Sequence, residues 1–202
     1  MEFLAPLIAV VLAYAVGSLS FAVIVSRGMG LSDPRSYGSG NPGATNVLRS
    51  GNKTAALLTL ALDALKGYVP VMAALALQAR YGWGEATVGF VGLAAFLGHL
   101  WPVFFRFQGG KGVATALGVL VGISGWLGLV LGLLWLAVAA MSRYSSLASL
   151  SAAVLSPVVY VLASGLLWNA ERPVTGAIVV MAALLVWRHK ENIIRLMQGK
   201  ES

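Results

Sequence analysis

The sequence has no cysteine and few charged residues. Among its 202 residues are fourteen Lys and Arg, seven Asp and Glu, and two His. Without cysteine the chain can form no disulfide, thiolate nucleophile, thiolate metal ligand or S-acylated side chain. Charged residues make up 10% of the chain, against about 25% in an ordinary soluble domain. Two histidines and scattered acids also form no metal-ligand pattern, so we expect no bound metal.

What fills the sequence is apolar. Hydrophobic residues make up 58% of the chain, and the mean hydropathy is +0.83. These values predict an all-α integral membrane protein, folded as one polytopic membrane domain over residues 1–202. The net charge of +7 then indicates contact with anionic lipid rather than nucleic acid. The apolar runs are Phe3–Val25, Ala55–Leu77, Thr87–Phe105, Val113–Met141, Leu147–Leu167 and Val174–Trp187.

The run Val113–Met141 decides the number of crossings. As one helix its 29 residues would extend ~43 Å, well beyond a hydrocarbon core of ~30 Å. Ser124 and Gly125, near its middle, favour a break into a short helical hairpin. With six crossings, seven Lys and Arg fall on one side and six on the other, so charge gives no orientation.

With the hairpin, the chain crosses seven times and the basic residues separate eleven to two. The positive-inside rule therefore predicts seven transmembrane helices, with the N-terminus outside and the C-terminus in the cytoplasm. The eleven on the inner side are Arg27, Arg35, Arg49, Lys53, Arg106, Lys111, Arg143, Arg188, Lys190, Arg195 and Lys200.

The first inner loop is rich in glycine and small polar residues. It reads Ser-Gly-Asn-Pro-Gly-Ala-Thr-Asn over residues 39–46, and Arg49 follows. Such turns can direct successive backbone N–H groups to one point, and arginine suits phosphate oxygens. Glycines alone would indicate only a connecting loop, but with Arg49 we interpret the segment as an oxyanion site. Its candidate ligands are Ser39, Gly40, Asn41, Gly43, Thr45, Asn46 and Arg49.

The second inner loop reads Gly109-Gly110-Lys111-Gly112 and precedes a predicted helix. Glycines leave room for a phosphate, amides at a helix start point toward it, and a lysine supplies charge. The spacing is not that of a Walker A motif, so no nucleoside triphosphate is inferred. A basic interfacial anchor is the alternative, although it does not explain a lysine flanked by glycines. Gly110, Lys111 and Gly112 are therefore further candidate ligands.

Two later segments add polar groups on the same side. Ser145, Ser146 and Ser149 lie at a helix start, where serine is also a common cap. In the basic tail, His189 and Asn192 are three residues apart and share one helical face. A basic amphipathic anchor would explain the tail except for this pairing.

Ionisable residues also occur within the predicted spans. Asp63 and Lys66 have i, i+3 spacing and can neutralise each other, either as a functional or as a structural pair. His99 lies late in the third span, where a lone histidine is usually a packing residue. We retain Lys66 and His99 as secondary candidates.

Three motifs resemble those of one known family. The segments Ser39–Arg49, Gly98–Thr115 and Arg188–Glu201 resemble the PlsY family of bacterial membrane glycerol-3-phosphate acyltransferases, and the likeness covers nearly the whole chain. It implies acyl transfer from acyl phosphate to the 1-hydroxyl of sn-glycerol 3-phosphate. The products would be lysophosphatidate and phosphate, in the first step of phospholipid biosynthesis. It also implies a site facing the cytoplasm in the bacterial plasma (inner) membrane, with no cofactor.

The resemblance also implies residue roles. Ser39 and its glycine-rich loop would hold the phosphate of acyl phosphate. Glu201, the last residue of the third motif, would be structural. The glycerol 3-phosphate side would be lined by Arg49, Lys111, Ser146 or Ser149, His189 and Asn192.

The chemistry expected is direct attack by the glycerol hydroxyl, without an acyl-enzyme. Neither histidine belongs to a His-x-x-x-x-Asp motif, so a substrate phosphate or His189 remains as proton acceptor. Alternatives are a transporter of an organic phosphate anion, a CDP-alcohol phosphotransferase and a non-catalytic lipid-binding protein. The transporter lacks polar residues toward the outer face, the phosphotransferase lacks an aspartate cluster, and a lipid binder needs no pair of glycine-rich oxyanion loops.

Overall fold

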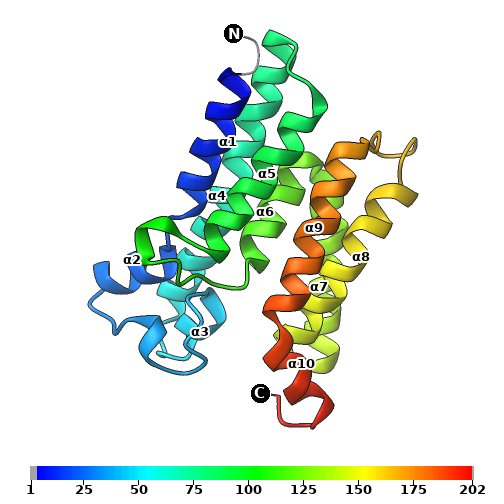
Figure 1. The fold of residues 1–202 in the computed structure, drawn as a ribbon. Coiled ribbons are helices and arrows are strands. Elements are labelled where there is room, and N and C mark those ends of the chain that lie inside the picture. Colours follow the sequence, from blue (N-terminus) through cyan, green and yellow to red (C-terminus); the bar gives the residue numbers. More distant parts are fainter. Residues whose placement is uncertain (1–3, 202) are drawn as a thin grey trace.

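The structure, a computed structural model, describes residues 4–201, and helices are its regular elements throughout that range (Figure 1). The all-α class predicted from the sequence is confirmed. Two short 3-10 turns, η1 (Pro34–Ser36) and η2 (Val103–Phe105), lie in the loops. The α-helices are α1 (Leu4–Gly17), α2 (Phe21–Gly28), α3 (Ala44–Leu48), α4 (Lys53–Tyr81), α5 (Glu85–Leu100), α6 (Val113–Ile123), α7 (Gly125–Ser142), α8 (Ser145–Leu162), α9 (Arg172–Arg188) and α10 (Lys190–Met197).

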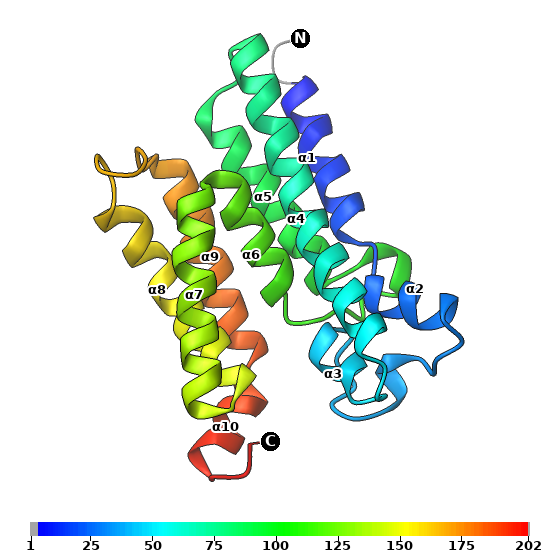
Figure 2. The same cartoon turned by 180° about the vertical axis from the view of Figure 1, so that it is seen from behind.

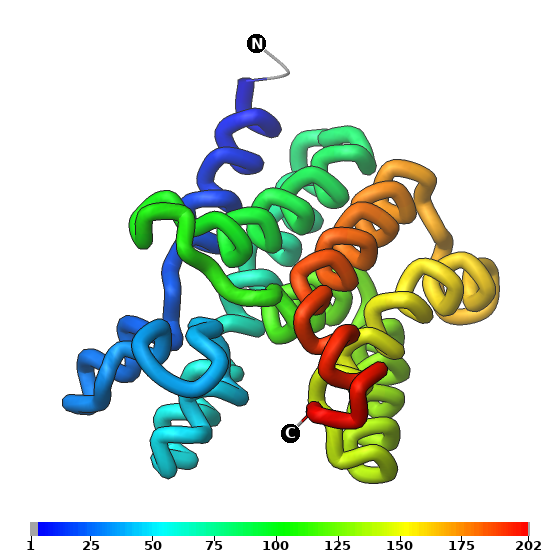
Figure 3. The backbone as a smooth tube through the Cα atoms, turned by 60° about the horizontal axis from the view of Figure 1, so that its bottom comes forward, coloured from blue at the N-terminus to red at the C-terminus, as the bar shows by residue number. Residues whose placement is uncertain are grey.

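The long helices form a bundle with polar segments gathered at one end. α1 lies beside α5, α4 beside α6, and α8 beside both α7 and α9. Figure 2 shows the turn between α4 and α5 at the end opposite to α3 and α10. Figure 3 brings forward the end that holds α3 and α10. In this view the green segment between α5 and α6 runs between the α2–α3 region and α10. Three segments far apart in sequence therefore meet at this end.

Small residues allow α4 and α6 to approach closely. A methyl group at Gly118 of α6 would collide with the backbone of Ala64 in α4. One at Gly67 of α4 would collide with the carbonyl oxygen of Thr115. Between apolar helices, such small residues permit the backbone contacts on which packing depends. This contact fixes the start of α6, and with it the preceding loop, against α4.

The sequence predicts a single helix for the first apolar run, but the structure divides this run into two helices. α1 and α2 are bent by 44° relative to each other, and Ser18 donates its hydroxyl to the carbonyl oxygen of Tyr14 at 2.8 Å. Serine hydroxyls that bond backward in this way compete with the helical ladder and favour bends. Lys66 stabilises the bend by donating to the carbonyl oxygen of Leu19 at 2.6 Å. Phe3, the predicted start of the run, lies outside the described residues.

The break predicted in the long run Val113–Met141 is confirmed. α6 ends at Ile123 and α7 begins at Gly125, with Ser124 as the cap that accepts from the backbone N–H of Leu127. Four of the described helical segments are long and apolar enough to cross a membrane, and the bent α1–α2 pair counts as a fifth if it is one span. α6, with 11 residues, is only about 17 Å long.

Candidate functional site

A large cavity of about 920 Å³ extends between α4, α6, α7, α8 and α9. Leucine, valine and glycine residues of α4, α6 and α7 line much of it, whereas Lys111, His189 and Asn192 lie at its polar end. The cavity thus joins a polar region to an apolar one. Of the predicted site residues, those that line it are Ser39, Asn41, Gly43, Thr45, Asn46, Arg49, His99, Lys111, Gly112, Ser146, Ser149, His189 and Asn192.

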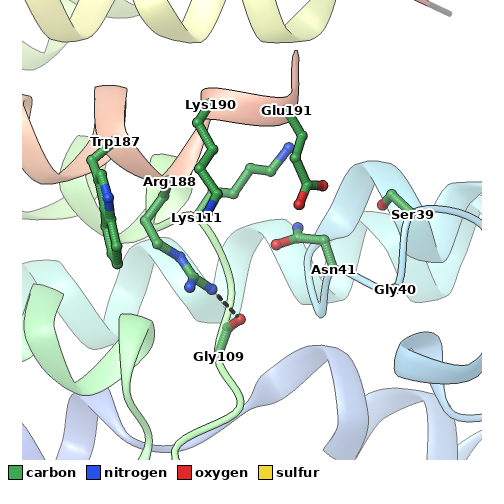
Figure 4. A pocket seen from close by; sticks show the side chains of 9 residues that line it. All are labelled: Ser39, Gly40, Asn41, Gly109, Lys111, Trp187, Arg188, Lys190 and Glu191. Carbon is green, nitrogen blue, oxygen red and sulfur yellow. Dashed lines mark hydrogen bonds between the residues drawn. The ribbon is translucent and has the colours of Figure 1, made fainter. Parts of the chain in front are cut away.

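A smaller polar pocket of about 210 Å³ lies against the first cavity, and Lys111 borders both. Figure 4 shows its three sources: the first loop at Ser39–Asn41, the second loop at Gly109 and Lys111, and the junction of α9 and α10. Gly40 lines the smaller pocket but not the large cavity. Lys111, which borders both, lies between the smaller pocket and the polar end of the large cavity.

Lys111 is held by the C-terminal helix. Its ammonium group donates a hydrogen bond to the side-chain oxygen of Asn192. Burial, together with the nearby cation of Arg195, lowers the pKa of Lys111 to about 8. The side chain is therefore mostly protonated at neutral pH, in a partly desolvated place where a cation attracts anions more strongly than in water.

His189, at the junction of α9 and α10, is buried and 2% exposed. Its Nδ1 lies 2.8 Å from the carbonyl oxygen of Leu185, so this nitrogen carries the hydrogen and Nε2 has a free lone pair. Burial is the main cause that lowers the pKa of His189 to about 4. The imidazole is accordingly neutral at pH 7 and can accept a hydrogen bond at Nε2.

Glu201 connects the C-terminal segment to the site. Its carboxylate accepts hydrogen bonds from Asn192 Nδ2 at 2.5 Å and Arg195 Nε at 2.8 Å. Although burial opposes it, the neighbouring side chains of Ser146, Asn192 and Arg195 hold the pKa of Glu201 below its ordinary value. Because Asn192 is fixed from one side by Glu201, its oxygen is presented to Lys111 on the other.

The two candidate serines differ in their surroundings. Ser149 Oγ donates to the carbonyl oxygen of Ser145 at 2.8 Å and accepts from Trp135 Nε1 at 3.0 Å. Ser146 lies beside the Glu201 carboxylate. Both line the large cavity, but the hydroxyl of Ser149 is already used in joining α7 to α8. Ser146 is the better placed of the two for a ligand.

Asn46 organises the first loop from within. It is buried, and its Nδ2 donates to the carbonyl oxygens of Pro34 at 2.6 Å and Tyr37 at 3.1 Å. Its Oδ1 accepts from the backbone N–H of Ser39 at 3.0 Å. These bonds hold the loop in shape, so the amide of Asn46 has little capacity left for a ligand.

Two predicted candidates line neither cavity. Lys66 Nζ lies 2.7 Å from Asp63 Oδ1, which confirms the predicted ion pair, and its side chain is 1% exposed. Gly110 is enclosed between His99 and the carbonyl oxygen of Pro42 in the first loop. We therefore no longer count either residue among the groups that meet a ligand directly.

Arg188 is a residue that the sequence reasoning missed. It donates from Nη2 to the carbonyl oxygen of Gly109 at 2.8 Å (Figure 4) and from Nε to that of Gly110 at 3.1 Å. Its place directly before His189, in the third motif, was the available signal. Among residues 4–201, no three His, Cys, Asp or Glu side chains are grouped as a metal site would need.

Comparison with known proteins supports a family assignment. The model of the family described as glycerol-3-phosphate acyltransferase matches residues 7–199. The glycerol-3-phosphate acyltransferase of Albidiferax ferrireducens is 60% identical over 197 residues, covering 98% of this chain and 88% of that protein. The protein of the same name from Ralstonia nicotianae is 59% identical, covering 95% and 90%.

Two solved structures have the same fold. Both are crystal structures of PlsY, described as an integral membrane glycerol 3-phosphate acyltransferase. The glycerol 3-phosphate form has a TM-score of 0.89 and 39% identity, and the lysophosphatidic acid form has a TM-score of 0.87 and 38% identity. In each case 98% of this chain and 94% of the other are covered.

Proposed function

This chain belongs to the PlsY family of glycerol-3-phosphate acyltransferases, and on that basis we propose that it moves an acyl group from acyl phosphate to the 1-hydroxyl of sn-glycerol 3-phosphate. The products are 1-acylglycerol 3-phosphate and inorganic phosphate. The observation that carries the proposal is the continuity of the large cavity, from Lys111 and His189 to the leucine-lined space between α6 and α7. Such a cavity suits reactants with phosphate at one end and a hydrocarbon chain at the other.

Each reactant has a part of the cavity that matches its chemistry. We place the phosphate of glycerol 3-phosphate near Lys111, Asn192 and Ser146, where a cation and polar groups meet. The phosphate of the acyl donor is placed against Ser39, Asn41 and Arg49, which border the same cavity. The acyl chain then extends along α7. The crystal forms of the related PlsY contain, by their descriptions, glycerol 3-phosphate and lysophosphatidic acid, which supports these two molecules as substrate and product here.

The reaction is a direct transfer. The glycerol 1-hydroxyl oxygen forms a bond to the acyl carbonyl carbon, the bond from that carbon to the phosphate oxygen breaks, and inorganic phosphate leaves with its electron pair. Acyl phosphate is an activated mixed anhydride, so the protein contributes positioning and cationic stabilisation of the departing phosphate and the developing oxyanion. Lys111 and Arg49 supply that stabilisation.

We assign the hydroxyl proton to a substrate phosphate. With a pKa of about 4, His189 is a weak base at neutral pH, because efficient proton transfer needs a pKa near the working pH. A phosphate monoester has its second pKa near ~6, which fits the task better. His189 then serves to accept a hydrogen bond at Nε2 and orient the hydroxyl.

We further propose that the chain crosses the bacterial plasma (inner) membrane seven times, with the N-terminus outside and the polar end of the cavity facing the cytoplasm. The eleven-to-two distribution of basic residues supports this orientation. The α6–α7 hairpin supplies two of these crossings, of which α6 is the short one and α7 is long enough to span by itself. Glycerol 3-phosphate reaches the site from water, and the acyl chain and the acylated product exchange with lipid.

The test is purified protein in detergent, given acyl phosphate and glycerol 3-phosphate. Phosphate release that depends on both substrates, with formation of 1-acylglycerol 3-phosphate, supports the proposal. Uptake of glycerol 3-phosphate into protein-containing vesicles without acylated product would instead indicate transport. Replacing acyl phosphate by acyl-CoA tests which acyl donor the protein uses. Turnover with acyl-CoA but not with acyl phosphate would contradict the assignment of acyl phosphate as the donor.

A further inference from the structure

A buried charged cluster lies behind the second loop, outside the set of groups used above. Lys66 Nζ is 2.7 Å from Asp63 Oδ1 and also donates to Leu19 O. His99 Nδ1 is 3.6 Å from the same Asp63 oxygen, and all three side chains are at most 7% exposed. Ionisable groups buried in this way are costly unless paired, and within a membrane-spanning bundle they usually serve a function.

His99 contacts the second loop in two ways. Its backbone carbonyl oxygen accepts the N–H of Gly110 at 3.1 Å, and its ring atom Nε2 occupies the space that a methyl group at Gly110 would need. The carbonyl oxygen of Pro42, in the first loop, lies 3.0 Å from the same methyl position. Gly110 is therefore the point where the second loop packs directly against both α5 and the first loop.

The same loop is held from α9. Arg188 turns the carbonyl groups of Gly109 and Gly110 toward its guanidinium. Lys111 follows directly, between the two cavities. The loop is thus fixed from both sides, by Arg188 and by His99, immediately before the lysine that meets the phosphate.

We infer that His99, oriented by the Asp63–Lys66 pair, is a positioning residue that fixes Lys111 through Gly110. Both ring nitrogens of His99 are directed at protein, Nδ1 toward Asp63 and Nε2 toward Gly110, so the ring acts through the loop although it borders the cavity. The inference rests on the proposed function, because it assumes that Lys111 binds a substrate phosphate. It assigns the buried pair a task in placing that cation.

A double-mutant cycle between His99 and Gly110 tests this contact. Gly110→Ala places a methyl group against the imidazole and should lower kcat/KM by about 10²-fold, chiefly through KM for glycerol 3-phosphate, as expected for a group displaced by ~1 Å. His99→Ala should do likewise through loss of support. In the double variant the methyl group fills the space left by the ring. The combined loss should therefore be at least about tenfold smaller than the product of the single losses.

Gly109→Ala is the matched control. Its methyl group would meet the backbone carbonyl oxygens of His99 and Leu100, which His99→Ala leaves in place. The losses for Gly109→Ala and His99→Ala should accordingly multiply. Multiplicative losses in the Gly110 cycle as well, or a His99→Ala variant with wild-type KM, would overturn the inference.

A second pair of variants separates positioning from stability. Asp63→Asn leaves Lys66 as an unpaired buried charge and should lower the unfolding temperature in detergent. Adding Lys66→Met removes that charge and should recover part of the unfolding temperature, since the bond to Leu19 O is lost as well, but should leave KM raised, because His99 still lacks its carboxylate. Recovery of KM together with the unfolding temperature would mean that the cluster is only structural.

The wild-type protein in the same assay separates failure of this inference from failure of the proposed function. If it forms no acylated product, the proposed function fails. The His99–Gly110 contact is still tested in that case, because the unfolding temperatures of the wild type and the three variants of the cycle should show the same compensation. Independent effects there would overturn the contact itself.

Discussion

Lys111 and Asn192 are joined by a hydrogen bond across 81 residues of sequence. This bond ties the loop before α6 to the C-terminal helix α10, and Glu201 holds the Asn192 amide from its other side at 2.5 Å. The cation at the centre of the proposed site is thus positioned by the first turn of α10. Its titration should be visible in the kinetics.

We expect activity to fall as the pH rises through about 8. Burial and Arg195 lower the pKa of Lys111 to about 8, so the group is a cation below this pH and neutral above it. Phosphate binding needs the cation, and KM for glycerol 3-phosphate should therefore rise on the alkaline side. In the Lys111→Arg variant the side chain retains its charge to much higher pH. The alkaline rise in KM should therefore move to higher pH or disappear, although the variant should be less active than the wild type. Initial rates of phosphate release between pH 6 and 10 provide the measurement, with buffer-only hydrolysis of acyl phosphate subtracted.

His189→Gln should lower kcat/KM about tenfold. This corresponds to one hydrogen bond between uncharged groups, worth about 0.5–1.5 kcal/mol. A general base would instead contribute about 10²–10⁴-fold. Because the pKa of His189 is about 4, the acid limb of the wild-type profile should follow the substrate phosphate near ~6 and persist in the variant. A loss of 10²-fold or more with an unaltered KM would make His189 the base.

The helical breaks show what hydropathy can and cannot predict. Ser124 and Gly125 interrupt a run too long for one crossing, so the length of the run called for a break, and the structure has it. The run at residues 3–25 has the length of a single span, so nothing in its hydropathy called for the bend at Ser18–Ser20. That bend depends on Lys66 reaching Leu19 O from 47 residues away. Tertiary contacts of this kind leave no local pattern.

The candidate site divides in a similar way. Residue types suited to phosphate were recognisable one loop at a time, and Lys111, His189 and Asn192 do border one cavity. The direction of each side chain was not recognisable. Asn46 has the composition of a ligand but bonds to its own loop. Gly110 belongs to a phosphate-loop pattern but is wedged against His99. Spacing identifies chemistry, whereas the assignment of each group to ligand or scaffold required the fold.

Arg49→Lys should raise KM for acyl phosphate by about tenfold or more without restoring wild-type behaviour. Arg49 borders the large cavity, and a planar guanidinium can bind two phosphate oxygens at once, which a lysine cannot. Loss of one charge-assisted hydrogen bond costs about 1.5–3 kcal/mol. Arg27→Lys is the control, because Arg27 is exposed on α2 and should tolerate the exchange. Equal kinetics for both variants would remove Arg49 from the proposed site.

The apolar end of the cavity should set the length of the acyl chain. Gly132 of α7 borders the cavity, and no atom lies within 4 Å of the position that its Cβ would take. It lies ten residues before the end of α7 at Ser142, which is about 15 Å along the helix. A larger side chain there should occupy space that the far end of a long acyl chain needs, while leaving the phosphate end unchanged.

Gly132→Leu should therefore lower kcat/KM for long-chain acyl phosphates by about tenfold relative to short-chain ones. Exclusion of two methylene groups at about 0.8 kcal/mol each accounts for this magnitude. Gly176→Leu is the matched control, since Gly176 lies in α9 with open space around it and borders neither cavity. KM for glycerol 3-phosphate should stay at the wild-type value in both variants. If Gly132→Leu lowers the rates with all chain lengths equally, the acyl chain does not extend along α7, because a block at that depth can only affect chains that reach it.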